Sequence, residues 1–205
     1  MNIKKGILLS AVAGVSMAAT SADALTFDLS VVYTGATPGG TSPWVTITIT
    51  DVVANVVNVS VSHNASSAAG QFISNVYLNL DPFVGTIALS NEVNGNKRNG
   101  FTVSDDGVNG AAGNQFDMGI GFATSNSGGG VNRLKPGEVW SADMTGTGLS
   151  ENSFMAVSNQ GLEAGAHLQG IAGGLSSHIT TVPEPGTFVA MGLGAVALLA
   201  RRRRK

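Results

Sequence analysis

The sequence predicts an all-β fold, a single β-sandwich of about eight or nine short strands. Runs of Val, Ile, Thr and Phe alternate apolar with polar residues, which is typical of half-buried strands. Gly, Asn, Asp and Pro interrupt these runs every eight to twelve residues or so. No stretch of ten or more body residues has an amphipathic helical period. A jelly-roll strand order is one option, because strand pairing does not follow from this pattern.

The first strands are expected in the valine-rich part that follows residue 24. Residues 25–33 are rich in the β-branched and aromatic side chains that favour strands. Residues 44–50 alternate strictly, so one face is apolar and the other carries threonine. A break at Asp51 separates them from a valine-rich strand over residues 52–62, and the two strands are expected to pair or to continue through a bend at Asp51. The alternating residues are Val45, Ile47 and Ile49 on one side and Thr46, Thr48 and Thr50 on the other.

Shorter strands and stronger turn signals follow in the middle of the body. Residues 71–80 and 83–90 are expected as strands separated by an Asp-Pro turn. Residues 91–100 are expected as an exposed loop or hairpin tip, because they combine asparagine–glycine turn signals with two cations. A short strand over residues 101–104 is expected to end at the turn Asp105-Asp106-Gly107.

The clearest core strand lies in the second half of the body. Phe116, Met118, Ile120 and Phe122 alternate with small or acidic residues, so the outer face of this strand is almost bare. Glycines on that face would let another backbone approach closely. The remaining expected strands are residues 138–146 with Trp140 in the core, 152–160, 166–171 and 179–182.

The amino terminus has the pattern of a secretory signal peptide. Two lysines precede an apolar stretch, and Ala22 and Ala24 form a small-x-small cleavage site. Residues 1–24 are therefore assigned to the signal peptide, and residues 25–181 to the mature body. An uncleaved membrane anchor is the alternative, which the short apolar stretch disfavours.

The carboxyl terminus combines three segments over residues 182–205. A stiff Pro-Glu-Pro segment precedes the uncharged residues 186–200, which are expected to form one short transmembrane helix. Five cations then end the chain and are expected on the cytoplasmic side. Fifteen helical residues span about 22 Å, short of the roughly 30 Å of a bilayer core, which favours a processed signal over a plain membrane anchor. The residues concerned are Pro183, Glu184, Pro185, Arg201, Arg202, Arg203, Arg204 and Lys205.

This order of segments closely resembles the PEP-CTERM sorting signal of Gram-negative bacteria, which is also labelled as the C-terminal domain of ice-binding proteins. The resemblance implies that an exosortase, a membrane-embedded transpeptidase, recognises Pro183, Glu184 and Pro185 and removes the tail. It implies an inner-membrane-anchored precursor that then reaches the cell envelope or the extracellular space. Members of this family are associated with exopolysaccharide and biofilm formation, so a matrix role is what the resemblance implies.

Parts of the body also resemble the bodies of small PEP-CTERM proteins. The similar parts are residues 116–154 and residues 166–176. Where those relatives have an aromatic residue after the last serine, this chain has Ser177-His178. The resemblance implies no established biochemical activity for the body.

The charge balance of the body excludes some partners. Seven of the eleven cations lie in the two targeting segments, which leaves four against the twelve carboxylates from Asp28 to Glu184, a net charge of about −8. Such a body has no electrostatic footprint for nucleic acid. The chain also has no cysteine, which excludes thiol catalysis, thiolate metal sites and disulfides.

Metal chemistry has one weak candidate. Asp105, Asp106 and Asp117 with nearby carbonyls could bind calcium, although a plain Asp-Asp-Gly turn is the preferred reading. His63, His167 and His178 have no ligand spacing and are expected as solvated or hydrogen-bonded structural residues. No cofactor is therefore assigned.

No catalytic residues are assigned either, and the protein is expected not to be an enzyme. Glu138 and Asp143 would fall on opposite faces of one strand, which does not suit a glycosidase pair. The Gly-x-Ser-x-Gly elbow of serine hydrolases does not occur. Trp44 is the best candidate for an exposed sugar-stacking ring. The threonine row at residues 46–50 is read as a solvent face, because an ice-binding surface needs several such rows.

The sequence thus predicts an exported, exosortase-sorted protein of the cell surface or extracellular matrix. Its role would be structural or interactive, linked to exopolysaccharide or biofilm. The alternative is a glycan- or calcium-binding β-sandwich module anchored at the envelope.

Overall fold

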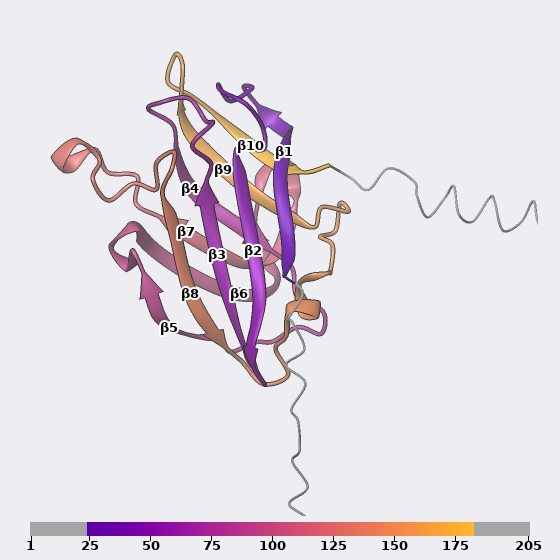
Figure 1. The fold of residues 1–205 in the computed structure, drawn as a ribbon. Coiled ribbons are helices and arrows are strands. Elements are labelled where there is room, and N and C mark those ends of the chain that lie inside the picture. The colour runs from indigo at the N-terminus through magenta and orange to yellow at the C-terminus, as the bar shows by residue number, and fades with distance from the viewer. Residues whose placement is uncertain (1–23, 183–205) are drawn as a thin grey trace, which may run out of the picture.

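The computed structural model describes residues 24–182, and these form an all-β domain (Figure 1). Residues 1–23 of the predicted signal peptide, including Ala22, lie outside this part, as do the apolar segment 186–200 and the basic tail, whereas Ala24 is described and exposed. Among the described helices, none is long and apolar enough to cross a membrane. The strands are β1 (Leu25–Gly35), β2 (Val45–Val53), β3 (Val56–His63), β4 (Phe72–Leu78), β5 (Ala88–Val93), β6 (Arg98–Asn109), β7 (Gln115–Phe122), β8 (Val139–Thr145), β9 (Ala164–Ile171) and β10 (Leu175–Thr181). Four short 3-10 helices are η1 (Gly95–Lys97), η2 (Ala111–Gly113), η3 (Ser127–Gly129) and η4 (Glu151–Phe154).

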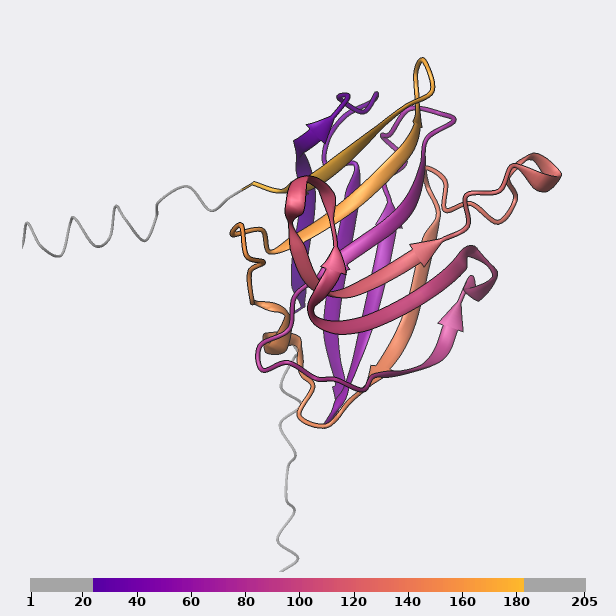
Figure 2. The same cartoon turned by 180° about the vertical axis from the view of Figure 1, so that it is seen from behind.

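The ten strands form one continuous antiparallel sheet in the order β5-β8-β3-β2-β1-β10-β9-β4-β7-β6. The sheet curls on itself, so that the half with β2, β3 and β8 faces the half with β9, β4, β7 and β6 (Figures 1 and 2). The two edge strands, β5 and β6, are consecutive in the chain and are joined through η1. The all-β prediction is confirmed, but a single curled sheet of ten strands supplies both layers.

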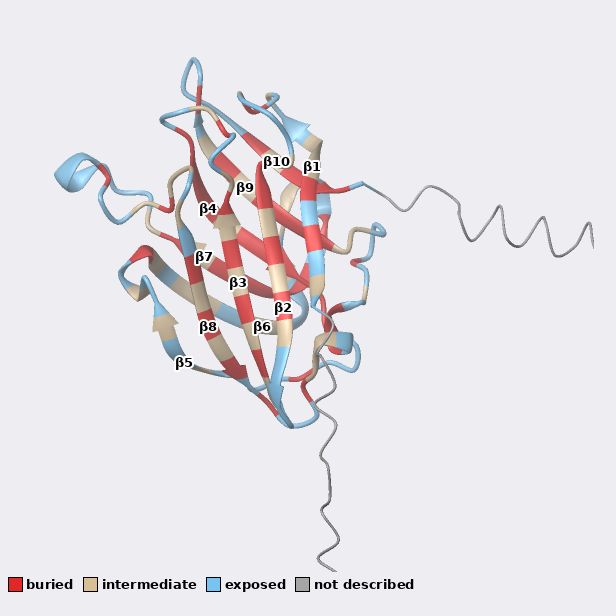
Figure 3. Ribbon diagram, in the orientation of Figure 1, coloured by how far each residue is buried: buried red, intermediate tan, exposed pale blue. Residues whose placement is uncertain are grey.

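The core lies between the two halves and follows the predicted alternation. Val45, Ile47 and Ile49 of β2 are fully buried, whereas the threonines between them are partly exposed (Figure 3). Each such buried side chain stabilises the fold by about 1.5–3 kcal/mol. Trp140 is fully buried, as predicted, and its ring meets Phe122 edge-on at 5.7 Å between centroids.

Three predicted boundaries are wrong. β2 continues past Asp51 to Val53, and the chain turns at Asn55, whose φ of 67° suits asparagine better than most residues. Residues 83–87 are not strand, because β5 begins only at Ala88. Residues 152–160 are not strand either, since a reciprocal capping box between Ser150 and Ser153 starts η4 there.

The predicted turn Asp105-Asp106-Gly107 is wrong as well, because β6 runs through it. Between Val103 and Val108 the register against β7 shifts, so the intervening residues form a bulge. Phe116 also departs from its predicted place in the main core. Its buried ring stacks instead on Tyr77, with centroids 5.3 Å apart.

Candidate interaction surfaces

The body and the predicted sorting segment meet at the end of β10. This strand is not an edge strand, because it pairs with β1 on one side and β9 on the other. Thr181 is the last strand residue and lies opposite Leu29 of β1. Val182 follows and is half exposed, and the described chain ends there (Figure 1). The predicted sorting residues Pro183, Glu184 and Pro185 lie beyond the described residues.

The outer face of β1, β2, β3 and β8 carries hydroxyl groups in register. One row crosses four neighbouring strands, because each of its residues lies opposite the next, and the strands are about 4.8 Å apart. Within the described structure, none of its four hydroxyls has a hydrogen-bond partner. The threonines of β2 thus belong to a wider polar face, because serines of β3 and β8 and Thr26 of β1 lie beside them. The row is Thr26, Thr48, Ser60 and Ser141.

Two shorter rows flank the hydroxyl row and end on carboxylates. In the first, Thr46 lies between Ser62 and Asp28 and donates a 2.8 Å hydrogen bond to the Asp28 carboxylate. In the second, Asp143 accepts hydrogen bonds of 2.7 Å from Asn58 and from Asn91. These two amides lower the pKa of Asp143, because their hydrogen bonds stabilise the charged form. The centre of this face is therefore neutral and polar, with its negative charges on either side.

The opposite half has a glycine-floored depression on its outer face. Gly119 and Gly121 of β7 lie opposite Tyr77 and Asn75 of β4, and Gly121 also lies opposite Gly100 of β6. The depression has a volume of about 250 Å³. A Cβ atom at Gly119 would approach the side chain of Val108 to 2.9 Å, so glycine at this position makes room for Val108. The bare outer face predicted for this strand is confirmed, and it admits a side chain of β6 over Gly119.

Two of the three histidines stack beside this depression. His167 and His178 lie opposite each other on β9 and β10, with ring centroids 4.1 Å apart and planes within 2°. Ser74 lies 2.9 Å from Nδ1 of His167. Burial lowers the pKa of both rings, and the neighbouring His167 lowers the pKa of His178 further, to about 4. Both imidazoles are therefore neutral at pH 7. The sequence separation of eleven residues gave no sign of this pair.

Asp117 acts as a hydrogen-bond acceptor for two backbone segments. Its Oδ2 accepts from the amide of Leu80 and its Oδ1 from the amide of Asp106, each at 2.8 Å. Asp105 and Asp106 are exposed, whereas Asp117 is buried. Within residues 24–182, no group of three or more His, Cys, Asp or Glu side chains could hold a metal ion. The three aspartates predicted as a weak calcium site therefore do not assemble into one.

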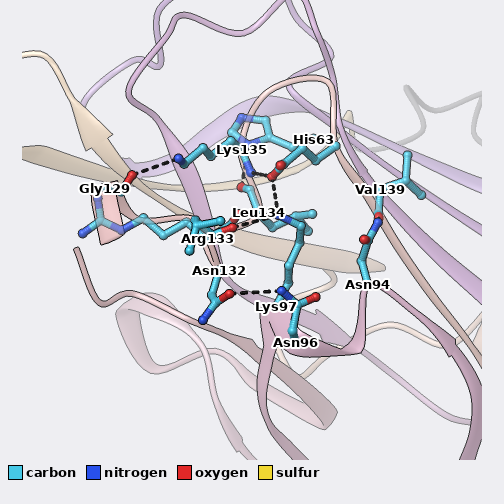
Figure 4. A network of polar contacts seen from close by, with 12 residues as sticks. His63, Asn94, Asn96, Lys97, Gly129, Asn132, Arg133, Leu134, Lys135 and Val139 are labelled. Carbon is cyan, nitrogen blue, oxygen red and sulfur yellow. Dashed lines mark hydrogen bonds and ion pairs between the residues drawn. The ribbon is translucent and has the colours of Figure 1, made fainter. Parts of the chain in front are cut away.

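Lys97 contradicts the prediction that residues 91–100 form an exposed loop. It is only 5% exposed, and its ammonium donates to the Glu138 carboxylate at 2.8 Å and to the carbonyls of Arg133 at 3.0 Å and Val131 at 3.3 Å (Figure 4). Its partner Glu138 also accepts from the amide of Lys135 at 2.7 Å. Burial opposes the charged form of Glu138, but these hydrogen bonds lower its pKa overall. The network fastens the loop before β8 to η1.

The remaining histidine, His63, and a second cation of the body, Arg98, also serve the fold. His63 is fully buried and its Nδ1 lies 3.0 Å from the carbonyl of Leu134, to which it donates (Figure 4). Burial lowers its pKa, so it is a hydrogen-bonded structural residue as predicted. Arg98 pairs with Glu92 through two hydrogen bonds of 2.6 and 2.9 Å, and Trp140 donates to the same carboxylate at 3.1 Å.

Neither tryptophan, both of which lie in the described residues, offers an exposed ring for sugar stacking. Trp44 is 6% exposed, so its predicted exposure is wrong. The reason is that Trp44 directly precedes β2, where its amide bonds the carbonyl of Leu29 at 3.1 Å and its ring joins the core. The two carboxylates considered as a glycosidase pair have different partners. Glu138 accepts a hydrogen bond from Lys97, and Asp143 accepts hydrogen bonds from Asn58 and Asn91.

The protein consists of an all-β body whose last strand is followed, after one residue, by a Pro-Glu-Pro segment. A family model for the PEP-CTERM protein-sorting motif matches residues 181–205. The chain therefore carries a PEP-CTERM sorting motif at these residues, which confirms the resemblance seen in the sequence. The motif indicates a secreted, exosortase-processed protein that reaches the cell envelope. No curated protein and no solved structure matches the chain.

Proposed function

We propose that this protein is a structural or interaction component of the cell surface or extracellular matrix, linked to exopolysaccharide or biofilm. The single observation that carries this proposal is the sorting motif fused to an all-β body. In this proposal the signal peptide exports the chain, and the apolar segment 186–200 holds a precursor in the inner membrane until exosortase removes it. The body, a β-sandwich in the broad sense, then remains as the functional part.

The surfaces of the body support contact with neutral partners. The hydroxyl row offers donors and acceptors in a regular array, and no charged side chain belongs to that row. The four cations between the targeting segments make hydrogen bonds within the body, as Lys97 and Arg98 do. An acidic polysaccharide would meet the net negative charge of the body and would need a bridging cation.

The proposal is tested by following the protein in cells with a disabled motif. Replacing Pro183, Glu184 and Pro185 by alanine should leave the protein in the inner-membrane fraction and reduce the mass of exopolysaccharide retained by the biofilm. An Asp105→Asn variant, altered in the body but in neither the motif nor the candidate surfaces, should still reach the matrix. Equal distribution and equal biofilm mass for the motif variant and the parent would contradict the proposal.

A glycan-binding module is the second candidate, and the hydroxyl row favours it. Hydroxyl groups without protein partners can exchange hydrogen bonds with a neutral polysaccharide that lies across the strands. The double variant Thr48→Val with Ser60→Ala should weaken retardation of the mature protein in gels that contain neutral polysaccharide. Thr102 lies opposite Gly119 and lines the glycine-floored depression, so Thr102→Val is the matched control. If the control weakens retardation and the double variant does not, the depression is the glycan site instead.

We also propose that the body has no catalytic activity. Its most plausible carboxylate pair is engaged in two separate sets of hydrogen bonds, and neither carboxylate has a raised pKa. A general acid for glycoside hydrolysis needs a raised pKa. Hydrolysis of a polysaccharide by the purified mature protein, abolished by Glu138→Gln or Asp143→Asn, would contradict this.

A further inference from the structure

The sorting motif and the folded body share residues. The motif model begins at residue 181, yet Thr181 is the last residue of β10 and lies opposite Leu29 of β1. Only Val182 separates this strand from Pro183. The body therefore provides almost no spacer before the Pro-Glu-Pro segment.

The end of β10 is held firmly in the sheet. Thr180 and Thr181 are 3% and 9% exposed. The hydroxyl of Thr180 donates to the carbonyl of Ala164 at 2.8 Å, and that of Thr181 donates to the Glu163 carboxylate at 3.2 Å. Thr180 also lies opposite Gly165 of β9, so β10 is flanked on both sides. These residues cannot pair with another chain while the body is fully folded.

A partner that takes up a peptide in extended form commonly adds it as a strand to its own sheet edge, which requires the backbone groups of the peptide to be unpaired. The residues on the amino-terminal side of the motif are those that β10 has already paired. We propose that the folded body withholds these residues from exosortase, so that cleavage requires the end of β10 to be open. The inference rests on the proposed exosortase processing and adds an order of events to it.

The processing reaction is an ordinary acyl transfer. The peptide bond on the body side of the tail breaks, and its acyl group passes to water or to an amine or hydroxyl group of the envelope. The tail leaves with a new amino terminus that takes up the proton of the attacking nucleophile. The body contributes nothing to this chemistry; it sets how often the substrate segment is accessible.

The test is a pulse-chase measurement of precursor half-life in cells that contain exosortase. One variant carries a flexible spacer of about eight Gly and Ser residues between Val182 and Pro183. The matched control carries the same spacer between Gly173 and Gly174, in the exposed turn that joins β9 to β10. Protease resistance of the body verifies that both variants fold.

The inference predicts that the spacer after Val182 shortens the precursor half-life roughly thirtyfold, the factor that two ordinary backbone hydrogen bonds represent in an equilibrium. The control spacer should leave the half-life within about twofold of the parent. Equal half-lives for the parent and the spacer variant would overturn the inference while leaving exosortase processing intact. A parent precursor that persists equally with and without exosortase would overturn the proposed function and this inference with it.

Discussion

Asp117→Asn should destabilise the body strongly, because the carboxylate serves two backbone amides at once. It accepts from Leu80 and from Asp106 at 2.8 Å each, and the side chain is 7% exposed. Asparagine keeps one acceptor oxygen, so one of the two hydrogen bonds remains, now to a neutral amide oxygen in place of a carboxylate. The other amide would face an NH₂ group and lose its partner.

The expected cost follows from these two contacts. Losing a hydrogen bond to a charged group and leaving a buried donor unpaired costs about 2–3 kcal/mol. For a domain of this size, that loss lowers Tm by roughly 5–10 °C. The assay is thermal unfolding of the mature protein followed by circular dichroism, with urea unfolding as the second measure.

Asp105→Asn is the matched control, because that side chain is exposed in the same bulge. It should change the free energy of unfolding by less than about 0.5 kcal/mol. Added calcium should leave Tm unchanged, since both Asp117 oxygens already accept hydrogen bonds. The reasoning is refuted if Asp117→Asn is as stable as the parent, or if calcium raises Tm in the parent but not in that variant.

Three further predictions address other parts of the body. Lys97→Met should cost about 2 kcal/mol in urea unfolding, because its carbonyl and carboxylate partners lose their donor. Lys135→Met in the loop before β8 should be nearly neutral, because that ammonium donates from an exposed position, and equal losses would contradict this. Because the pKa of His178 is lower in the folded protein, the unfolded chain binds more protons below pH 6.5. The free energy of unfolding should therefore fall as the pH drops from 6.5 towards 4. His178→Gln should weaken this pH dependence in unfolding curves measured across that range. Gly40→Ala should lower Tm far more than Gly174→Ala, because both have positive φ but only a Cβ at Gly40 collides with backbone; similar shifts in calorimetry would refute the steric reading.

The parts of the fold that depend on local alternation were predictable. Residues 45–49 and 118–122 reveal their buried face directly, since side chains alternate across a strand. The prediction that the strand ends at Asp51 was wrong, because the residue type at Asp51 does not determine how far β2 pairs with β3. Here β3 pairs with β2 as far as Val53.

The features that failed depend on contacts between distant segments. Asp105-Asp106-Gly107 is a good turn sequence, but the carboxylate of Asp117 on the adjacent strand binds the amide of Asp106 and turns the segment into a bulge. Lys97 looked exposed because the carbonyls and carboxylate that surround it lie more than thirty residues away.

The candidate surfaces show the same division. The threonines of β2 were visible as one row, whereas the neighbouring hydroxyls of Ser60 and Ser141 appear only when the register is known. The stacking of His167 on His178 likewise needs the pairing of β9 with β10. The sorting segment, by contrast, was predictable because it is a linear motif that needs no partner strand.

The most direct test of the central claim is the carboxyl terminus of the mature protein, determined by intact mass and peptide mapping in the envelope and medium fractions. Exosortase processing predicts a chain that ends at or near Pro183–Pro185 and lacks residues 201–205. A chain that still carries Lys205 in the membrane fraction would contradict the account and leave a body held in the membrane by its own tail.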